Sequence, residues 1–287
     1  RGCDLKVILD HPEMANLLVS HALTTTYTYK FLIELDCGDG RGGISPESPR
    51  MDEIASAVIG APRVQLTGVI THAGQAYHAH SDDEMKQHAE EERKAALRAV
   101  QRLEALQVQC QIVSIGSTPT AMFTDDLSGG ITELRAGVYI FSDLFQASVR
   151  SSTQEDIALT VLCTIIGHNE DKNQMLVDAG GLALSKDRSL AECEPAFDYQ
   201  YGLVCDVKGR VCQPLLVVQS CSQEHGKITL HQAEEGTIDF ASFPLGSNLR
   251  ILPNHSCMTA AAHPHYWCVA EEGSTEILDK WTRCNYW

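Results

Sequence analysis

The order of apolar segments along the chain is the feature that most restricts its fold. In the first half, short apolar runs alternate with stretches of helical spacing. The expected strands are residues 5–9, 30–36, 64–71, 109–115 and 131–134. Because strands separated by helices pair in parallel, this pattern predicts a parallel sheet. The repeat length suits a (β/α) barrel, but we count five units where a closed barrel has eight.

Helix-forming signals lie between these strands. Asp10 is expected to cap the first helix, with Pro12 and Glu13 in its first turn. A second helix is expected around residues 51–59. Ser81 and Glu84 have the spacing of a capping box at the start of a long helix that runs to about residue 106.

From about residue 157 the pattern changes to strand-like runs that follow one another with turns between them. These runs are residues 157–166, 174–178, 202–207, 214–219, 228–232, 248–252 and 266–269. Such a succession predicts an antiparallel β domain. The predicted fold is therefore α/β: part of a (β/α)8 barrel over residues 1–150, then an antiparallel β domain over residues 151–287.

The segment Pro253-Asn254-His255-Ser256-Cys257 places an imidazole and a thiol two residues apart. In an extended segment, residues i and i+2 face the same side, so His255 and Cys257 would converge on one ion. Nitrogen with sulfur is a ligand set that zinc favours, and two protein ligands leave positions open, as a catalytic metal requires. The alternative is that Cys257 is a small buried hydrophobic residue.

Unusual residues also follow the expected barrel strands, where the active sites of barrels gather. Gly116-Ser117-Thr118-Pro119 lies between a strand and a helix, and its hydroxyl groups and free amides suit a phosphate. An ordinary capped turn accounts for the same residues. The sequence leaves both interpretations open.

Two further groups lie at equivalent points. Gly137 would free a backbone amide for the same phosphate, and Tyr139 would bond to or stack on a ring, although core packing is the alternative for this tyrosine. His72, Gln75 and Tyr77 cluster after the third strand. A single histidine at a strand end is often structural, but three polar or aromatic groups together favour a site.

Charge and apolar content exclude several classes of partner. The chain of 287 residues has 22 basic and 38 acidic residues, for a net charge of -16, which disfavours nucleic acid and anionic membranes. No apolar run has the length of a membrane span. The 11 cysteines include no C-x-x-C pair and indicate free thiols in a reducing compartment, so we expect a cytoplasmic protein.

Together these motifs resemble the eukaryotic-type D-serine dehydratase family, whose members have the alanine racemase-like fold. The resemblance covers nearly the whole chain. The matching segments are Leu35-Asp36-Cys37-Gly38, His72-Ala73-Gly74-Gln75-Ala76-Tyr77, Gly116-Ser117-Thr118-Pro119, Glu133-Leu134-Arg135-Ala136-Gly137-Val138-Tyr139 and Pro253-Asn254-His255-Ser256-Cys257.

The resemblance implies pyridoxal phosphate and zinc as cofactors. It places the phosphate at Ser117, Thr118 and Gly137, puts His72, Tyr77 and Tyr139 near the cofactor, and makes His255 and Cys257 zinc ligands beside it. The implied reaction is the dehydration of D-serine to pyruvate and ammonia, in which the cofactor is the electron sink. Zinc would bind the β-hydroxyl and make it a better leaving group.

Related reactions stay open as alternatives. They are dehydration of D-threo-3-hydroxyaspartate, retro-aldol cleavage of D-threonine, and non-catalytic binding of pyridoxal phosphate. In the aldolases of this type we expect a carboxylate at the second metal position, so Cys257 favours a dehydratase. The substrate would be a small D-amino acid, and enzymes with this fold commonly form homodimers.

One part of the family pattern is missing from the sequence. The lysine that anchors the cofactor lies on the first barrel strand in this family, whereas this chain, which starts at Arg1, resembles the family from about the fourth strand. Lys6 and Lys30 lie on or beside strands, but neither has the context of that lysine. We therefore expect an N-terminally truncated fragment that does not hold the cofactor covalently and is inactive by itself.

Overall fold

The chain divides into two units in the computed structural model, which describes residues 3–193, 195–270 and 273–284. Unit 1 is Arg1–Gly137 and unit 2 is Val138–Trp287. The division comes earlier than the boundary expected between residues 150 and 151. The reason is that the amides of Leu144 and Phe145 donate to the carbonyl groups of residues 253 and 254, which ties the connecting segment to unit 2.

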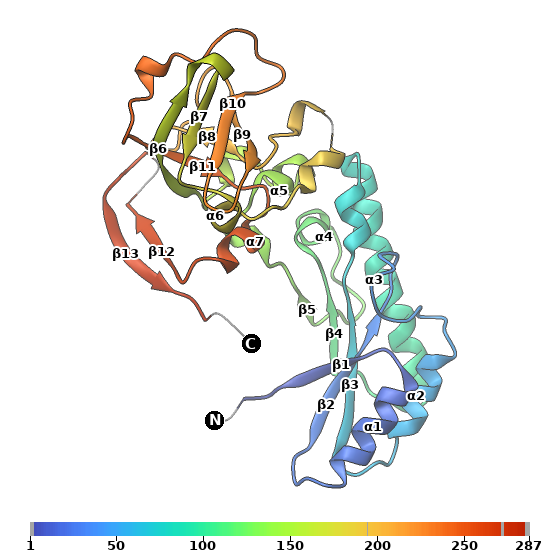
Figure 1. Cartoon of the computed structure of the whole chain (residues 1–287). Helices are drawn as coiled ribbons and strands as arrows, with labels where there is room; N and C mark the ends of the chain where they lie inside the picture. The colour runs from blue at the N-terminus through green and yellow to red at the C-terminus, as the bar shows by residue number, and fades with distance from the viewer. Residues whose placement is uncertain (1–2, 194, 271–272, 285–287) are drawn as a thin grey trace. The chain divides into compact units, whose positions relative to one another are not determined.

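Unit 1 is built on a five-stranded sheet in the order β1-β2-β3-β4-β5. Every neighbouring pair is parallel, as the sequence pattern predicted. Helices α1, α2 and α3 lie along one face of this sheet (Figure 1). In chain order the elements are β1 (Lys6–Leu9), α1 (Pro12–Ala22), β2 (Tyr29–Leu35), α2 (Arg50–Val58), β3 (Val64–Thr71), α3 (Asp82–Ala105), β4 (Ile112–Ile115), α4 (Thr118–Phe123) and β5 (Glu133–Leu134).

The core of unit 1 lies between the sheet and these helices. Phe31 and Ile33 of β2 are fully buried, and each such side chain contributes about 1.5–3 kcal/mol to folding. Helix α3 places small side chains, Ala96 and Ala99, in the same cluster, which lets a long helix approach the sheet closely. Gly68 is required for β3 and β4 to pair, because a Cβ atom there would lie 1.7 Å from the carbonyl oxygen of Ile112.

The helix starts follow the sequence signals with one exception. Ser81 caps α3 by accepting a hydrogen bond from the amide of Glu84 at 3.2 Å, as predicted. The prediction that Asp10 caps α1 is wrong: His11 is the N-cap, and its Nδ1 accepts from the amide of Glu13 at 3.2 Å. Asp10 instead accepts a hydrogen bond at 3.1 Å from the amide of Gly43, which anchors the loop after β2.

Unit 2 contains a closed antiparallel barrel with the strand order β10-β7-β6-β11-β8-β9. The strands are β6 (Val161–Asn169), β7 (Gln174–Val177), β8 (Leu203–Cys205), β9 (Leu216–Cys221), β10 (Gly226–Leu230) and β11 (Asn248–Leu252). Alternating residues of β6, Val161, Cys163 and Ile165, point into its core, as the period of a half-buried strand requires. The predicted antiparallel β domain is confirmed.

Unit 2 also contains short α-helices and a hairpin. The helices are α5 (Leu144–Ser148), α6 (Gly181–Leu184) and α7 (Ser256–Ala261), and the hairpin joins β12 (His265–Val269) to β13 (Ile277–Thr282). β12 and β13 form a separate two-stranded sheet. Trp267 and Trp281 on this hairpin are more than half exposed, at 57% and 54%. Within the described part of the chain, no helix is both long and apolar enough to cross a membrane.

Candidate functional site

The loops that follow β3 and β4 meet at the carboxyl edge of the sheet in unit 1. The Ser117 hydroxyl donates to the carbonyl oxygen of Ala73 at 3.4 Å, which joins the two loops. The rings of His72 and Tyr77 lie 6.4 Å apart between centroids. Burial lowers the pKa of His72, which favours its neutral form. The structure therefore brings His72, Tyr77 and Ser117 to one region, as the sequence predicted for their strands.

Gln75 has a structural role in the same region. Its Nε2 donates to the carbonyl oxygen of Cys37 at 3.0 Å, linking the loop after β3 to the loop after β2. The Cys37 thiol in turn donates to the carbonyl oxygen of His72 at 3.5 Å. These two bonds hold the His72 backbone in place.

The residues after β4 form a capping box, and the hydroxyl group of Thr118 takes no part in it. Ser117 Oγ accepts from the amide of Thr120 at 3.4 Å, while Thr120 Oγ1 accepts from the amide of Ser117 at 3.1 Å. The capped turn weighed for this segment is therefore present. Thr118 is 3% exposed, and its hydroxyl oxygen is buried without a hydrogen-bond partner. A buried hydroxyl without a partner is costly, so a ligand that accepts from Thr118 would be favoured here.

Gly116 is held close to the end of β5. Its φ is +116°, and a Cβ atom would lie 2.7 Å from the carbonyl oxygen of Arg135. Arg135 crosses the sheet edge, with its Nε donating to Ser114 Oγ at 2.9 Å and its Nη2 donating to the carbonyl oxygen of Thr71. Glycine is needed at position 116 so that the backbone of the predicted phosphate loop can approach β5.

Gly137 and Tyr139 are not packed tightly as Gly116 is. A Cβ atom at Gly137 would meet nothing within 4 Å, so the packing of this chain does not itself require glycine there. Tyr139 is 57% exposed, which shows that the core-packing interpretation of this side chain is wrong. The binding role predicted for both residues stays a prediction.

A buried carboxylate that the sequence analysis missed supports the predicted phosphate loop. Glu92 of α3 is 1% exposed. Its Oε1 accepts from the Thr71 hydroxyl at 2.7 Å and from the amide of Gly116 at 2.9 Å, and its Oε2 accepts from the Thr120 hydroxyl at 2.8 Å. Its position on the apolar face of α3, between Ala89 and Ala96, was the signal in the sequence.

The lysines on the strands of unit 1 lie away from this edge. Lys6 and Lys30 are paired opposite one another near the beginnings of β1 and β2, and both amino groups contact the carboxylate of Asp4 at 2.9 Å. Lys86 and Lys94 are on α3. Among the described residues of unit 1, no lysine lies in the loops that directly follow the strands.

In unit 2, His255 and Cys257 are brought together, but not by an extended segment. His255 is the N-cap of α7 with extended backbone angles, and Cys257 is in the first turn of the helix. The prediction that alternation along a strand aligns the two side chains is therefore wrong. Cys257 still acts on the imidazole, because after Asp187 it is the second cause of the raised pKa of His255. Cys257 is exposed, which also excludes the buried-cysteine alternative.

His255 is paired with a carboxylate on its other side. Its Nδ1 lies 3.1 Å from Oδ2 of Asp187. This hydrogen bond, followed by the interaction with Cys257, raises the pKa of His255 to about 10. The same contact lowers the pKa of Asp187 to about 2. Asp187 was missed because it lies in a charged segment, Lys186-Asp187-Arg188, that reads as an ordinary surface loop.

The donor set of this site is compatible with a metal ion. With Nδ1 facing Asp187, Nε2 is the ring nitrogen that remains to bind a metal, and the thiol of Cys257 would supply a sulfur ligand. Across the described ranges, no three His, Cys, Asp or Glu residues are grouped so as to hold a metal ion. Within the part of the chain that the structure describes, His255 and Cys257 are the two residues that would ligate zinc at this site.

The backbone around the two residues is firmly held. Asp143 Oδ2 accepts a 2.8 Å hydrogen bond from the amide of Ser256, and its Oδ1 accepts one of 2.8 Å from the amide of Gln146 at the start of α5. At the other end of α7, the Thr259 hydroxyl donates to the carbonyl oxygen of Leu184 at 2.9 Å. Residues 255–257 are thus fixed from both sides.

Comparisons with known proteins match both parts of the chain. The family model for the alanine racemase N-terminal domain matches residues 1–144, and that for a putative serine dehydratase domain matches residues 158–269. A D-threo-3-hydroxyaspartate dehydratase of Delftia sp. (strain HT23) is 38% identical over 100% of this chain and 74% of its own length. A D-serine dehydratase of Dictyostelium discoideum is 29% identical over 99% of this chain and 72% of its own length.

A solved structure with the same 38% identity also resembles the chain. It is a D-threo-3-hydroxyaspartate dehydratase variant in its metal-free form, with a TM-score of 0.92 and 38% identity. The match covers 100% of this chain and 74% of that chain. The likeness thus extends through the parallel sheet of unit 1 and the antiparallel barrel of unit 2.

Proposed function

The chain belongs to the D-serine dehydratase family with the alanine racemase-like fold, and from this we propose that it is a lyase that removes water from a D-3-hydroxy amino acid with the help of pyridoxal phosphate and zinc. The observation that carries the proposal is the placement of His255 at the N-cap of α7 with Cys257 in the first turn of the same helix. A non-catalytic barrel protein would not need this pair.

The carboxyl edge of unit 1 has groups that suit pyridoxal phosphate. The unpartnered hydroxyl of Thr118 would donate to the phosphate, together with the amide of Gly137. The half-buried rings of His72 and Tyr77 would contact the cofactor ring. The exposed ring of Tyr139, which follows Gly137 in the chain, remains a predicted contact.

The pair in unit 2 suits zinc. His255 would supply a nitrogen ligand and Cys257 a thiolate, and both side chains are accessible to an entering ion. The metal-free variant structure of a similar dehydratase supports a metal in this type of enzyme. We further propose that the protein works in a reducing compartment such as the cytoplasm, because its 11 cysteines are free, and that it forms a homodimer.

The chemistry would be shared between cofactor, metal and side chains. When bound, pyridoxal phosphate supplies an electron sink for the α-carbon, and zinc supplies a Lewis acid for the leaving hydroxyl. The residues of this chain would bind and orient the cofactor. Thr118 would hold the phosphate group, and neutral His72 would contact the pyridine ring without adding charge. Among residues 3–193, 195–270 and 273–284 we assign no base that removes the α-proton.

The preferred substrate is D-serine or D-threo-3-hydroxyaspartate. Both are substrates named for similar proteins, and the 38% identity with the hydroxyaspartate dehydratase exceeds the 29% with the D-serine dehydratase. Cleavage of D-threonine is the second candidate, since a D-threonine aldolase of Arthrobacter sp. is also similar, at 25% identity. Cys257 favours dehydration over this cleavage, because we expect a carboxylate at that position in the aldolases.

The test is to measure product release by the protein expressed from its complete gene, supplied with both cofactors. We expect pyruvate from D-serine or oxaloacetate from D-threo-3-hydroxyaspartate, with ammonia in either case. A chelator should abolish release and zinc should restore it. Glycine from D-threonine without release of a 2-oxo acid would contradict the dehydratase proposal, and full activity after complete removal of zinc would contradict the metal.

A further inference from the structure

The carboxylate of Asp187 faces the imidazole of His255 across a long separation in sequence. The distance between Asp187 Oδ2 and His255 Nδ1 is 3.1 Å, and the two residues are 68 positions apart. The side chain of Asp187 is 18% exposed and that of His255 is 34% exposed, so the contact is largely shielded from water. Shielding strengthens such a contact and separates it from an ordinary surface ion pair.

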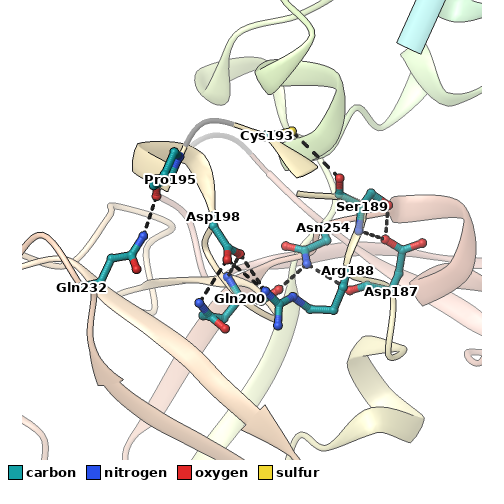
Figure 2. Close-up of polar contacts among 9 residues, drawn as sticks. All are labelled: Asp187, Arg188, Ser189, Cys193, Pro195, Asp198, Gln200, Gln232 and Asn254. Atoms are coloured by element: carbon teal, nitrogen blue, oxygen red, sulfur yellow. Dashed lines mark hydrogen bonds and ion pairs between the residues drawn. The ribbon is translucent and has the colours of Figure 1, made fainter. Parts of the chain in front are cut away.

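The other carboxylate oxygen is held by the turn that Asp187 itself begins. Its Oδ1 accepts a 2.8 Å hydrogen bond from the amide of Ser189 and another from the Ser189 hydroxyl. Figure 2 shows these contacts at the start of the segment. With Oδ1 occupied in this way, only Oδ2 remains to face His255, so the carboxylate is oriented before any ligand arrives.

The backbone of Asp187 is clamped by the residue that precedes His255. Asn254 is 2% exposed, and its Nδ2 donates to the carbonyl oxygen of Asp187 at 3.0 Å and to that of Gln200 (Figure 2). One buried amide therefore connects the histidine segment to both ends of the loop that carries Asp187. This fixes the separation of Asp187 and His255.

The loop is also braced internally. Arg188 Nη2 donates to both carboxylate oxygens of Asp198, at 3.1 and 2.9 Å, and its guanidinium carbon lies 5.2 Å from the centroid of the Tyr201 ring. Asp198 Oδ1 also accepts from the amide of Gln200 at 3.0 Å. These contacts belong to the same loop as Asp187 but do not touch His255, which makes Asp198 a suitable control.

We propose that Asp187 is a positioning residue for the metal site, which orients His255 so that Nε2 points to the ion. The proposal rests on the proposed zinc function of His255 and Cys257. Metal-binding histidines commonly donate their second ring N–H to a carboxylate, which selects the tautomer, fixes the ring plane and makes the ligating nitrogen a stronger donor. Loss of such a partner typically weakens metal binding by about 10- to 100-fold.

The test is zinc affinity measured by competition with a chromogenic chelator, at a single pH, for purified protein. We expect Asp187→Ala to weaken zinc binding by about 10- to 100-fold. Asp187→Asn keeps a hydrogen-bond acceptor of the same size without the charge and should give a smaller loss. Asp198→Asn, which breaks the ion pair with Arg188 in the same loop, should bind zinc within about twofold of the wild type.

Cobalt supplies a second readout that does not depend on turnover or on the stability of the fold. In cobalt-loaded Asp187→Ala, the thiolate-to-cobalt absorption band from Cys257 should remain while the bands sensitive to the histidine ligand shift. The same circular dichroism spectrum in all variants would exclude misfolding as the cause.

The possible outcomes distinguish failure of the positioning role of Asp187 from failure of the zinc site itself. Zinc affinity in Asp187→Ala and Asp187→Asn equal to that of the wild type, while His255→Ala loses zinc, would overturn the role of Asp187 and leave the zinc site intact. An equal loss in Asp198→Asn would also overturn it, because the effect would then belong to the loop as a whole. Wild-type binding retained in both His255→Ala and Cys257→Ala would overturn the zinc site and the positioning role together.

Discussion

Glu92 on α3 and Thr120 in the first turn of α4 are joined by a 2.8 Å hydrogen bond in the interior of unit 1. The same carboxylate accepts from Thr71 at the end of β3 and from Gly116 after β4. One buried side chain therefore ties the loop predicted to bind phosphate to the longest helix of unit 1.

Substitution of Glu92 should destabilise this unit. Glu92→Ala would remove the acceptor that three buried donors share, and we expect a loss on the order of 3 kcal/mol in the free energy of unfolding. Glu92→Gln should cost less, because the threonine hydroxyls can rotate to accept from the new amide. Urea unfolding followed by circular dichroism measures both, with Glu104→Ala as an exposed control on the same helix. Unchanged stability of Glu92→Ala would show that the network contributes nothing.

Thr118→Val should separate ligand binding from folding. The Thr118 hydroxyl has no protein partner, so its removal should leave the unfolding midpoint unchanged or slightly higher. Affinity for pyridoxal phosphate should fall by about tenfold, which corresponds to the loss of one hydrogen bond to a charged group. Equilibrium dialysis checks this, and Thr124→Val at the other end of α4 is the control. Equal affinity in Thr118→Val and wild type would place the phosphate elsewhere.

Cys257→Ala should remove zinc without affecting the fold. The thiol is exposed, so its loss costs little stability. Zinc affinity should fall by more than about 100-fold, beyond the range expected for a supporting partner such as Asp187. Metal content after dialysis and chelator competition give the result, and Cys3→Ala, another exposed cysteine, serves as the control. Retention of stoichiometric zinc would show that Cys257 is not a ligand.

Alkaline pH should destabilise the chain through its buried thiols. Burial raises the pKa of Cys37, Cys163 and Cys205 to about 12 from an ordinary value of 9.0. The stabilising effect of these protonated thiols is complete below pH 9.0, and it is lost as pH rises toward 12, because the unfolded chain releases its thiol protons first.

Each fully shifted thiol contributes a slope of about 1.4 kcal/mol per pH unit in this range. Urea unfolding midpoints at pH 8, 9 and 10 should therefore fall with increasing steepness. Cys163→Ala should show a shallower decline, although its absolute stability is lower because a cavity forms. A midpoint independent of pH up to 10 in the wild type would contradict this prediction.

The chain of 287 residues should bind pyridoxal phosphate without a covalent bond. Lys6 and Lys30 are paired with Asp4 near the beginnings of their strands, away from the loops after β3 and β4. Borohydride reduction after incubation with the cofactor should label no lysine at stoichiometric yield, as judged by peptide mass spectrometry. A label on either of these lysines would refute the assignment of the site to the carboxyl edge.

The elements of the fold were predictable where the apolar pattern is regular. β11 was predicted at residues 248–252 and is observed there, and the parallel order of unit 1 follows from its alternating strands and helices. β13 was missed because its residues are all exposed and carry no alternating pattern. The first strand of the barrel was expected from residue 157 but starts at Val161, since Gln154–Asp156 form a short 3-10 helix before it.

The candidate sites were only partly predictable, for a physical reason. His255, Cys257, Ser117 and Thr118 were identified because each belongs to a short motif in the sequence. Glu92 and Asp187 were not, since their roles arise from contacts with residues 24 and 68 positions away, at Gly116 and His255. A charged residue on the buried face of a helix was a usable signal for Glu92, whereas nothing local distinguishes Asp187 from an ordinary surface acid.

The position of the β12–β13 hairpin decides what the fluorescence of its two tryptophans reports. Within residues 3–193, 195–270 and 273–284, the tryptophans are Trp267 and Trp281, and both lie on this hairpin, outside the barrel and the parallel sheet. Their emission therefore reports the local environment of one exposed ribbon. The fluorescence of these two residues would therefore follow loss of the hairpin during denaturation and not the melting of either core.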